Sequence, residues 1–346
     1  MNKTIKRMAM GVDKIYFVLP GTGKDYQGGG LNVGLTLSEM LSKQYDVEVV
    51  LYKQNDSVHR SLDEAMDEAS KNSIFIITWG PDIELLAKKL DGKNVVYFAQ
   101  SVGWNTNIPS NIPIISVSRY VMSYWASKNP FNPMFVLSPI VDVPSETNSI
   151  KDIDVLFIER KSSIYLKGYL VPELRKNFNV HTVSDFVSRN DLLALLKRSK
   201  VYIYSSREHG HSGHNWIEGF GLQPLEAFLC GCSVFSNLHG GLSDHMDPSI
   251  NMQQLEVFSL GYDLHRISNA IKNNNNRKCD TLEQITLHYS ETNFETRLNS
   301  IMHEIVDFFD FQHTSQYNDI KLTDVKVPSR RANLWKSSLK NKLKKL

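Results

Sequence analysis

Residues 218–226 read EGFGLQPLE, and this stretch, taken with its two flanks, decides the fold class. The apolar run at 201–205 before it predicts a buried strand, and the run at 233–236 after it predicts another. Between them a glycine-rich segment leads, at about residue 221, into a helix that ends near residue 230. A strand, a helix and a second strand in this order are typical of a parallel α/β sheet.

The same alternation extends outward in both directions along the 346 residues. Further strands are expected at 14–19, 47–52, 74–78, 94–98, 114–118, 134–137, 153–158 and 178–182, and further helices at 28–43, 81–90, 167–176, 191–198 and 294–309. A polar, turn-rich stretch at 138–150 separates two such series. We therefore expect an N-terminal Rossmann-like domain at 1–142, a C-terminal one at 143–312 and a tail at 313–346. Ligands of such sheets bind beyond the carboxyl ends of the strands, so a cleft between the two domains is the expected site.

The composition is that of an ordinary soluble, well-cored protein, with 41% apolar and 22% charged residues. Three cysteines are too few for a disulfide framework. The first residues lack the apolar stretch of a secretory signal, and no apolar run approaches the roughly 18 residues that cross a bilayer. These features predict a cytoplasmic protein that contacts membranes, if at all, from the surface.

The net charge of +2 is unevenly distributed. Eight of the 39 Lys and Arg residues lie in 326–346, which holds no acidic residue, so the rest of the chain has 31 basic against 37 acidic side chains. Trp335, Leu339, Leu343 and Leu346 would line one face of a helix there, and lysines fill most of the remainder. A basic amphipathic helix indicates peripheral binding to an anionic membrane on its inner face, and the alternative is a solvated, disordered tail. Nucleic acid is not expected as a partner, since no nucleic-acid-binding motif accompanies the charge.

Two carboxylates, Glu218 and Glu226, stand eight residues apart around the predicted helix start. A carboxylate accepts two hydroxyl hydrogen bonds at once, which suits a sugar ring or a ribose. The amides around Phe220, Gly221 and Leu222 are donors at a helix N-terminus, which suits a phosphate. An isolated pair at this spacing is more often a cap and a surface residue, so the surrounding sequence decides between the two interpretations.

That surrounding sequence resembles the retaining GT-B glycosyltransferases, particularly family 4. The resemblance rests on Ser205-Ser206, then EGFGLQPLEA at 218–227, then CGCSV at 230–234 and Gly240-Gly241. It implies two Rossmann-like domains facing across a cleft. It also implies transfer of a sugar from a nucleotide-diphosphate sugar to a glycan or lipid-linked glycan acceptor, as in polysaccharide biosynthesis. Anomeric configuration would be retained through attack on the donor's front face, and no cofactor or metal would be required.

The resemblance also implies roles for particular residues of the C-terminal half. Glu218 would face the reacting carbon of the donor sugar, and Glu226 would bind the ribose hydroxyls. A basic pair would hold the diphosphate, with Lys167 as one member and either Arg160 or Lys161 as the other. This sequence departs from the family pattern there, because Glu159 stands where the family has glycine and the spacing to Lys167 is longer. Phe186 and Val187 would contact the nucleobase.

On the N-terminal side, triple glycine at 28–30 precedes a predicted helix, and Gly29 and Gly30 would let the backbone approach donor phosphate or acceptor. Gln100 stands where family members often place a histidine near the sugar, and it can bond a hydroxyl without titrating near neutral pH. Trp104 would stack on an acceptor sugar, unless it is a half-buried loop residue. His211 lies in the histidine-rich loop 208–214, for which we expect a polar pocket lining rather than a zinc site.

Two other function classes stay open from the sequence. The fold also suits a nucleotide-sugar epimerase, which would need no separate acceptor. A non-catalytic protein that binds a sugar nucleotide or a membrane is the third possibility, because Glu159 and Gln100 depart from the family pattern.

Overall fold

A computed structural model describes residues 11–23, 26, 28–104, 106–141, 143, 150–160, 162–205, 217–248, 250–255, 259–273 and 280–314. The chain forms two compact units, Met1–Val306 and Asp307–Leu346, and both sheets belong to the first. The described part of the second unit is the end of α10 (Glu291–Thr314). No helix in the described ranges is long and apolar enough to span a membrane.

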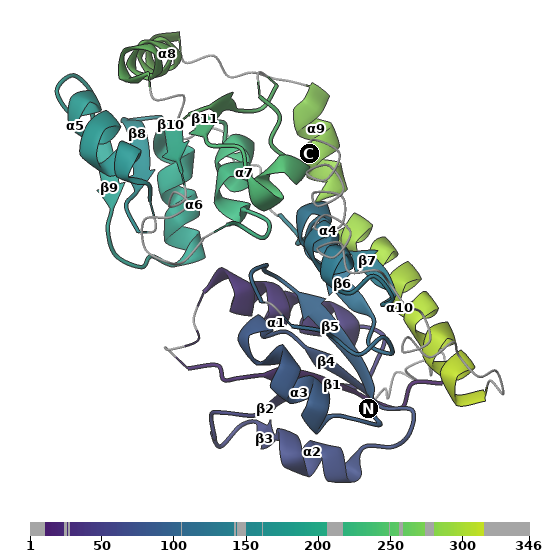
Figure 1. The fold of residues 1–346 in the computed structure, drawn as a ribbon. Helices are drawn as coiled ribbons and strands as arrows, with labels where there is room; N and C mark the ends of the chain where they lie inside the picture. The colour runs from purple at the N-terminus through teal and green to yellow at the C-terminus, as the bar shows by residue number, and fades with distance from the viewer. Residues whose placement is uncertain are drawn as a thin grey trace, which may run out of the picture. The chain divides into compact units, whose positions relative to one another are not determined.

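The first sheet has seven parallel strands in the order β3-β2-β1-β4-β5-β6-β7 (Figure 1). Its strands are β1 (Ile15–Leu19), β2 (Val47–Leu51), β3 (Arg60–Ser61), β4 (Ile74–Ile77), β5 (Asn94–Ala99), β6 (Ile114–Ser116) and β7 (Met134–Val136). Its helices are α1 (Gly29–Ser42), α2 (Leu62–Glu68), α3 (Ile83–Lys89) and α4 (Arg119–Lys128). Every residue of β1, β4 and β5 is buried, as expected for parallel strands covered on both faces.

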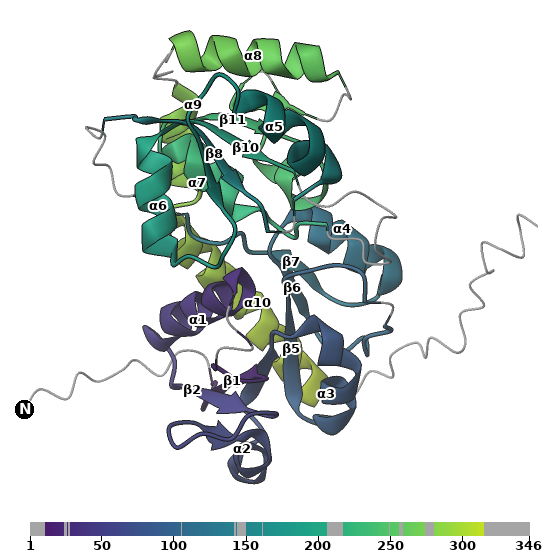
Figure 2. The same cartoon turned by 90° about the vertical axis from the view of Figure 1, so that its left-hand side faces the viewer.

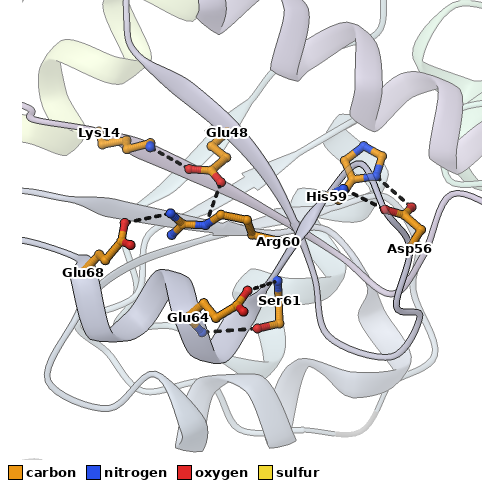
Figure 3. A network of polar contacts seen from close by, with 8 residues as sticks. All are labelled: Lys14, Glu48, Asp56, His59, Arg60, Ser61, Glu64 and Glu68. Atoms are coloured by element: carbon orange, nitrogen blue, oxygen red, sulfur yellow. Dashed lines mark hydrogen bonds and ion pairs between the residues drawn. The ribbon is translucent and has the colours of Figure 1, made fainter.

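The β3 edge of this sheet carries a chain of charges (Figure 3). Glu48 of β2 pairs with Lys14 at 2.6 Å and with Arg60 of β3 at 3.1 Å, and Arg60 also pairs with Glu68 at 2.8 Å. The sequence pattern did not predict β3, since a two-residue strand has no hydrophobic period. It did not predict α2 either, since this seven-residue helix buries only Leu62 and Ala65. Charges on such a short edge strand oppose pairing with another chain.

The second sheet has five parallel strands in the order β12-β11-β10-β8-β9. Its strands are β8 (Ile153–Ile158), β9 (Val180–Val183), β10 (Ser199–Tyr204), β11 (Ser233–Ser236) and β12 (Gln253–Gln254). Its helices are α5 (Val171–Leu174), α6 (Arg189–Arg198), α7 (Leu222–Leu229), α8 (Leu260–Asn273) and α9 (Asp280–His288). In Figure 2, α5 and α6 lie on opposite faces of this sheet.

Side chains alternate between these two faces along β10. Val201 and Ile203 pack into a core with residues of α5 and α8, while Tyr202 and Tyr204 point to the opposite face. β9 lies on one side of β8, and the next strand in the chain, β10, lies on the other side. The direction in which strands are added to the sheet therefore reverses between β8 and β10. Such a reversal opens the position where α/β sheets bind ligands.

Two parallel α/β sheets confirm the predicted fold class. The helix expected at 167–176 instead begins as a π-helical turn, Leu166–Leu170, that leads into α5. Pro172 has no N–H to donate, and the amide of Val171 bonds Leu166 one residue further back than in an α-helix. The predicted boundaries at 142 and 312 stay predictions.

The pair Asp152 and Asp154 is engaged in ion pairs at the second sheet. Asp152 pairs with Arg198 at 2.5 Å and Asp154 with Lys200 at 2.7 Å, both next to the start of β10. Their carboxylates are therefore engaged at the amino end of the sheet, opposite the end at which ligands bind.

Candidate active site

Loops that follow β8, β9 and β10 join at the carboxyl edge of the second sheet. Ser184 after β9 donates to the Glu159 carboxylate after β8 at 2.8 Å. The carbonyl of Ser205 after β10 accepts from the Ser163 amide at 3.0 Å and from the Ser162 hydroxyl at 3.4 Å. Glu159, Ser162 and Ser163 are thus bonded to the ends of both neighbouring strands.

Helix α7 starts at this edge without a side-chain cap. Its N-cap residue Gly221 has φ +85°, and a Cβ there would lie 2.3 Å from Cδ2 of Leu242, so glycine is required on both counts. The amides of Leu222 and Gln223 belong to the first turn and face outward from the helix start, whereas Pro224 has no N–H. This end of α7 has the polarity that favours a phosphate.

Glu218 precedes the helix start and is half-buried. Its Oε1 accepts a hydrogen bond from the hydroxyl of Tyr204, the last residue of β10. Burial and the adjacent Glu218 carboxylate hold the pKa of Tyr204 well above its usual range. The tyrosine therefore remains a neutral donor throughout the working range of proteins.

Glu226 lies in α7 and is 3% exposed. Burial raises the pKa of Glu226, and Arg189 at the start of α6 opposes that rise, with its Nε 2.8 Å from Oε1. A buried carboxylate needs such a partner to stay ionised. Arg189 thus keeps the carboxylate available as an acceptor.

Phe220 contributes its backbone rather than its ring to the site. The ring is buried, with centroids 4.6 Å from His245 and 5.5 Å from Tyr289. Its carbonyl bonds Nε2 of His245 at 2.8 Å. Between the two glutamates, the side chain at 220 therefore anchors the segment in the core.

Gly219 meets residues that follow strands of the first sheet. Its carbonyl accepts from the Ser118 hydroxyl at 2.6 Å, after β6. A Cβ on Gly219 would lie 2.0 Å from the carbonyl oxygen of Gln100, after β5, and a Cβ on Gly241 would lie 2.0 Å from the oxygen of Gly219. No side chain fits at 219 or 241, because backbone occupies the space on both sides.

Gln100 also contacts the start of α1. A Cβ on Gly30 would lie 3.1 Å from Oε1 of Gln100. Gly29 and Gly30 form the first turn of α1 and are exposed, and a Cβ on Gly29 would meet no atom within 4 Å. The structure therefore brings Gln100, the glycine turn and the segment at 219 together, and the roles predicted for these residues stay predictions.

Trp104 is half-buried and partly engaged. Its indole N–H donates to the Ser101 hydroxyl at 2.9 Å, and a Cβ on Gly80 would lie 2.2 Å from that nitrogen. The polar end of the indole thus faces protein, which leaves ring stacking as the contact available to a ligand.

Of the predicted diphosphate and base contacts that the structure describes, Arg160 follows β8, Lys167 lies in the π-helical turn, and Phe186 and Val187 follow β9. Lys167 is exposed, and its amide bonds the carbonyl of Ser163 at 3.2 Å. The guanidinium carbon of Arg160 lies 6.0 Å from the ring centroid of Phe186, which is 59% exposed, and Val187 is half-buried. Arg160 and Phe186 are thus brought together across neighbouring strand ends.

Two predicted residues, Lys161 and His211, lie outside the described ranges. Among the residues that the structure does describe, no group of three His, Cys, Asp or Glu side chains is arranged to hold a metal ion.

Sequence reasoning missed the partners of both glutamates. Alternation along β10 places Tyr202 and Tyr204 on one face, but only the fold shows that Tyr204 reaches Glu218. Arg189 follows the N-cap Ser188, and its pairing with Glu226 joins positions 37 residues apart. The sequence offered one signal for each residue: Tyr204 is an aromatic residue near the end of a predicted strand, and Arg189 is a basic residue near the start of a predicted helix.

We compared the chain with known protein families, protein sequences and solved structures. Residues 173–251, which include both glutamates, match the sequence model of the family described as Glycosyl transferases group 1. HepE from Anabaena, solved in complex with UDP-glucose, is 11% identical, with 84% of this chain and 99% of HepE covered and a TM-score of 0.61. No curated protein sequence matches the chain.

Two further solved structures have the same arrangement. WaaG, a glycosyltransferase involved in lipopolysaccharide biosynthesis, is 13% identical with a TM-score of 0.55. WaaB, a lipopolysaccharide outer core galactosyltransferase, is 12% identical with a TM-score of 0.57. In both, 84% of this chain and 99% of the other are covered. At these identities the likeness shows the fold, which is GT-B with two Rossmann-like domains.

Proposed function

We propose, from a group 1 glycosyltransferase segment on a GT-B fold, that the chain is a retaining glycosyltransferase. It would move a sugar from a nucleotide-diphosphate sugar to a glycan or lipid-linked acceptor. The observation that carries the proposal is the pair Glu218 and Glu226 on either side of the uncapped start of α7, within the matched segment. Acidic acceptors and helix amides together match a ligand with hydroxyls around a phosphate.

In this proposal each group has one task. Glu226 accepts from the ribose hydroxyls, and Glu218 accepts from a hydroxyl of the donor sugar. The amides at the start of α7 bind the diphosphate together with Lys167 and either Arg160 or Lys161. Fixed donors and cations stabilise the negative charge that develops on the diphosphate as the glycosidic bond breaks.

Retention is proposed through front-face attack. The acceptor hydroxyl approaches on the side from which the diphosphate leaves, and the departing phosphate oxygen takes the hydroxyl proton. The new bond forms at the anomeric carbon as the bond to the diphosphate breaks, so no protein nucleophile or cofactor enters the balance. Comparing the anomeric proton coupling of donor and product by NMR tests this step, and inversion would contradict it.

The acceptor is proposed to be a glycan, free or lipid-linked. Support comes from the fold neighbours WaaG and WaaB, whose names refer to lipopolysaccharide synthesis. Gln100, Trp104 and His211 would face the acceptor side. The basic segment 326–346 would hold the enzyme on an anionic membrane, where a lipid-linked acceptor is found.

Donor binding and consumption test the proposal. Thermal unfolding in the presence of UDP-, GDP-, ADP- and TDP-sugars should show a rise in Tm with one nucleotide class, which then serves as donor. Donor hydrolysis or transfer should fall at least about 100-fold in Glu218→Ala and in Lys167→Ala.

Matched controls are Glu173→Ala and Lys176→Ala. Glu173 lies in α5 and Lys176 follows its end, and the two pair with each other at 2.7 Å, so each change removes the same type of charge away from the site. Both controls should keep wild-type rates. Wild-type rates in the Glu218 and Lys167 variants would contradict the assignment, and a product formed without any acceptor would favour an epimerase instead.

A further inference from the structure

Tyr204 connects the end of a central strand to the first glutamate of the site. Its hydroxyl donates to Oε1 of Glu218. The ring stacks on that of Tyr202, two residues earlier on the same face of β10, with centroids 6.3 Å apart and planes 21° from parallel. The hydroxyl position is therefore set by a strand in the middle of the sheet and by a neighbouring ring, rather than by a loop.

We propose that Tyr204 is a positioning residue that fixes the Glu218 carboxylate, so that Oε2 is presented to a hydroxyl of the donor sugar. This inference rests on the proposed function. A glutamate side chain has several rotatable bonds, and its carboxylate has about four acceptor sites on two oxygens. One donor on Oε1 restricts the rotation and leaves the second oxygen for the substrate.

A positioning group must hold its proton under the conditions in which the enzyme works. Tyr204 meets this condition because burial and the carboxylate raise its pKa well above the ordinary value. Its hydroxyl remains a donor, and a carboxylate is the acceptor that strengthens such a bond most. Residues held rigidly by packing orient a site more closely than mobile ones.

Tyr202 provides a matched comparison on the same strand. Its ring is fully buried on the same face, and its hydroxyl donates at 3.3 Å to Oε1 of Gln223, a neutral amide. Removing either hydroxyl deletes one partly buried hydrogen bond that a residue of β10 donates. Only the loss at Tyr204 frees a carboxylate of the site, so the two variants separate positioning from stability.

The experiment compares Tyr204→Phe with Tyr202→Phe in donor hydrolysis, using the nucleotide sugar that stabilises the wild-type protein. Both variants should lower Tm by a similar amount. Tyr204→Phe should lower kcat about 10- to 100-fold, as expected for a lost bond to a charged group, with KM changed less than about threefold. Tyr202→Phe should keep kcat within about threefold. Equal kcat in the two variants would overturn the proposal.

A double-mutant cycle with Glu218→Gln provides the decisive reading. If Tyr204 acts through Glu218, Tyr204→Phe in the Glu218→Gln background should change kcat less than about twofold. Independent, additive losses would overturn the proposal.

Calorimetry adds an arm that needs no turnover. Tyr204→Phe should change the Kd of the nucleotide sugar less than about threefold, in line with KM, and should leave the Kd of UDP or its equivalent unchanged. A larger and equal weakening of both would overturn the proposal. If the wild type binds no nucleotide sugar, the proposed function fails first.

Discussion

Glu226 is the residue at which burial and function conflict most directly. A carboxylate that is 3% exposed is costly to ionise, and burial raises its pKa. Arg189 compensates from another element at 2.8 Å while its own side chain remains 44% exposed. The pair therefore keeps a buried acceptor charged beside a position that a ligand can reach.

Replacing Arg189 with Gln should destabilise the fold in a pH-dependent way. At pH 7 we expect a loss of about 1–3 kcal/mol, below the full cost of breaking a buried pair because the guanidinium is partly exposed. Without Arg189 the folded-state pKa of Glu226 rises further above the unfolded value. The resulting loss of unfolding free energy is therefore absent below the unfolded-state pKa of Glu226 and grows as pH rises through its folded-state pKa.

Urea unfolding at pH 5 and pH 7 measures this difference. The gap between wild type and Arg189→Gln should be smaller at pH 5. Arg189→Gln combined with Glu226→Gln should recover part of the stability at pH 7, because no buried charge is left unpaired. An equal gap at both pH values would show that Arg189 acts through contacts other than Glu226.

At the scale of elements, hydrogen bonds to its backbone carbonyls fix the segment before α7, in addition to the packing of the Phe220 ring. The amide of Gly241 bonds the carbonyl of Glu218 at 2.8 Å, and the imidazole of His245 bonds the carbonyl of Phe220 at 2.8 Å. The turn Gly240–Asp244 thus holds the segment in line with the helix. A rigid entry to α7 keeps both glutamates in register.

This arrangement predicts acid sensitivity through His245. Burial lowers the pKa of His245 to about 4, while the unfolded chain has the ordinary value of about 6.5. Because the folded-state pKa is depressed, the contribution of neutral His245 to the unfolding free energy is complete above pH 6.5 and is lost as pH falls toward 4. The loss amounts to about 3 kcal/mol by linkage. Unfolding free energies of wild type and His245→Gln between pH 7 and pH 4 check it.

The substitution should reduce stability at pH 7, since Phe220 loses a partner, but should flatten the pH dependence. A variant with the wild-type slope would show that the acid sensitivity arises elsewhere, for example at Asp56. Hydrogen bonds from the amide and ring of His59 lower the pKa of Asp56 to about 2, so that contribution is lost only below about pH 4 (Figure 3). The two windows are separate enough to be distinguished.

The elements also show what the sequence could predict. Long apolar runs such as β1 and β5 were predicted because burial on both faces leaves a clear pattern, and helices such as α1 and α6 were predicted from their apolar spacing. The helices α4 and α8 were not predicted. The edge strands β3 and β12 did not, since two residues carry no period. The π-helical turn could not be predicted from the hydrophobic pattern. It depends on the backbone hydrogen bond that Pro172 cannot donate, and apolar spacing carries no information about that bond.

The site divides in the same way. Glu218 and Glu226 could be singled out because their spacing and the glycines between them are local. Tyr204 and Arg189 could not, since their roles depend on which strand and helix ends the topology places together. Phe220 was selected for its amide, and the ring proved to belong to the aromatic cluster with His245 and Tyr289.

For the molecule as a whole, the charge distribution sets two opposing electrostatic effects. The sequence outside 326–346 has 31 basic and 37 acidic residues, so an anionic surface repels it within the Debye length of about 8 Å. The eight basic residues of 326–346 act in the opposite direction, at about 1 kcal/mol each near an anionic leaflet. Membrane association, as proposed, therefore depends on this segment alone.

Deleting residues 326–346 should abolish binding to vesicles that contain anionic lipid, because the remaining chain is repelled. Donor hydrolysis should stay within about threefold of the full chain, since every group assigned to the donor precedes the segment. A full-length variant with its five C-terminal lysines changed to Gln controls for length: Lys336, Lys340, Lys342, Lys344 and Lys345. Sedimentation with anionic and with zwitterionic vesicles at two salt concentrations measures binding. Vesicle binding that survives deletion would place the membrane contact elsewhere, and a parallel loss of hydrolysis would mean that the basic segment serves the donor site rather than the membrane.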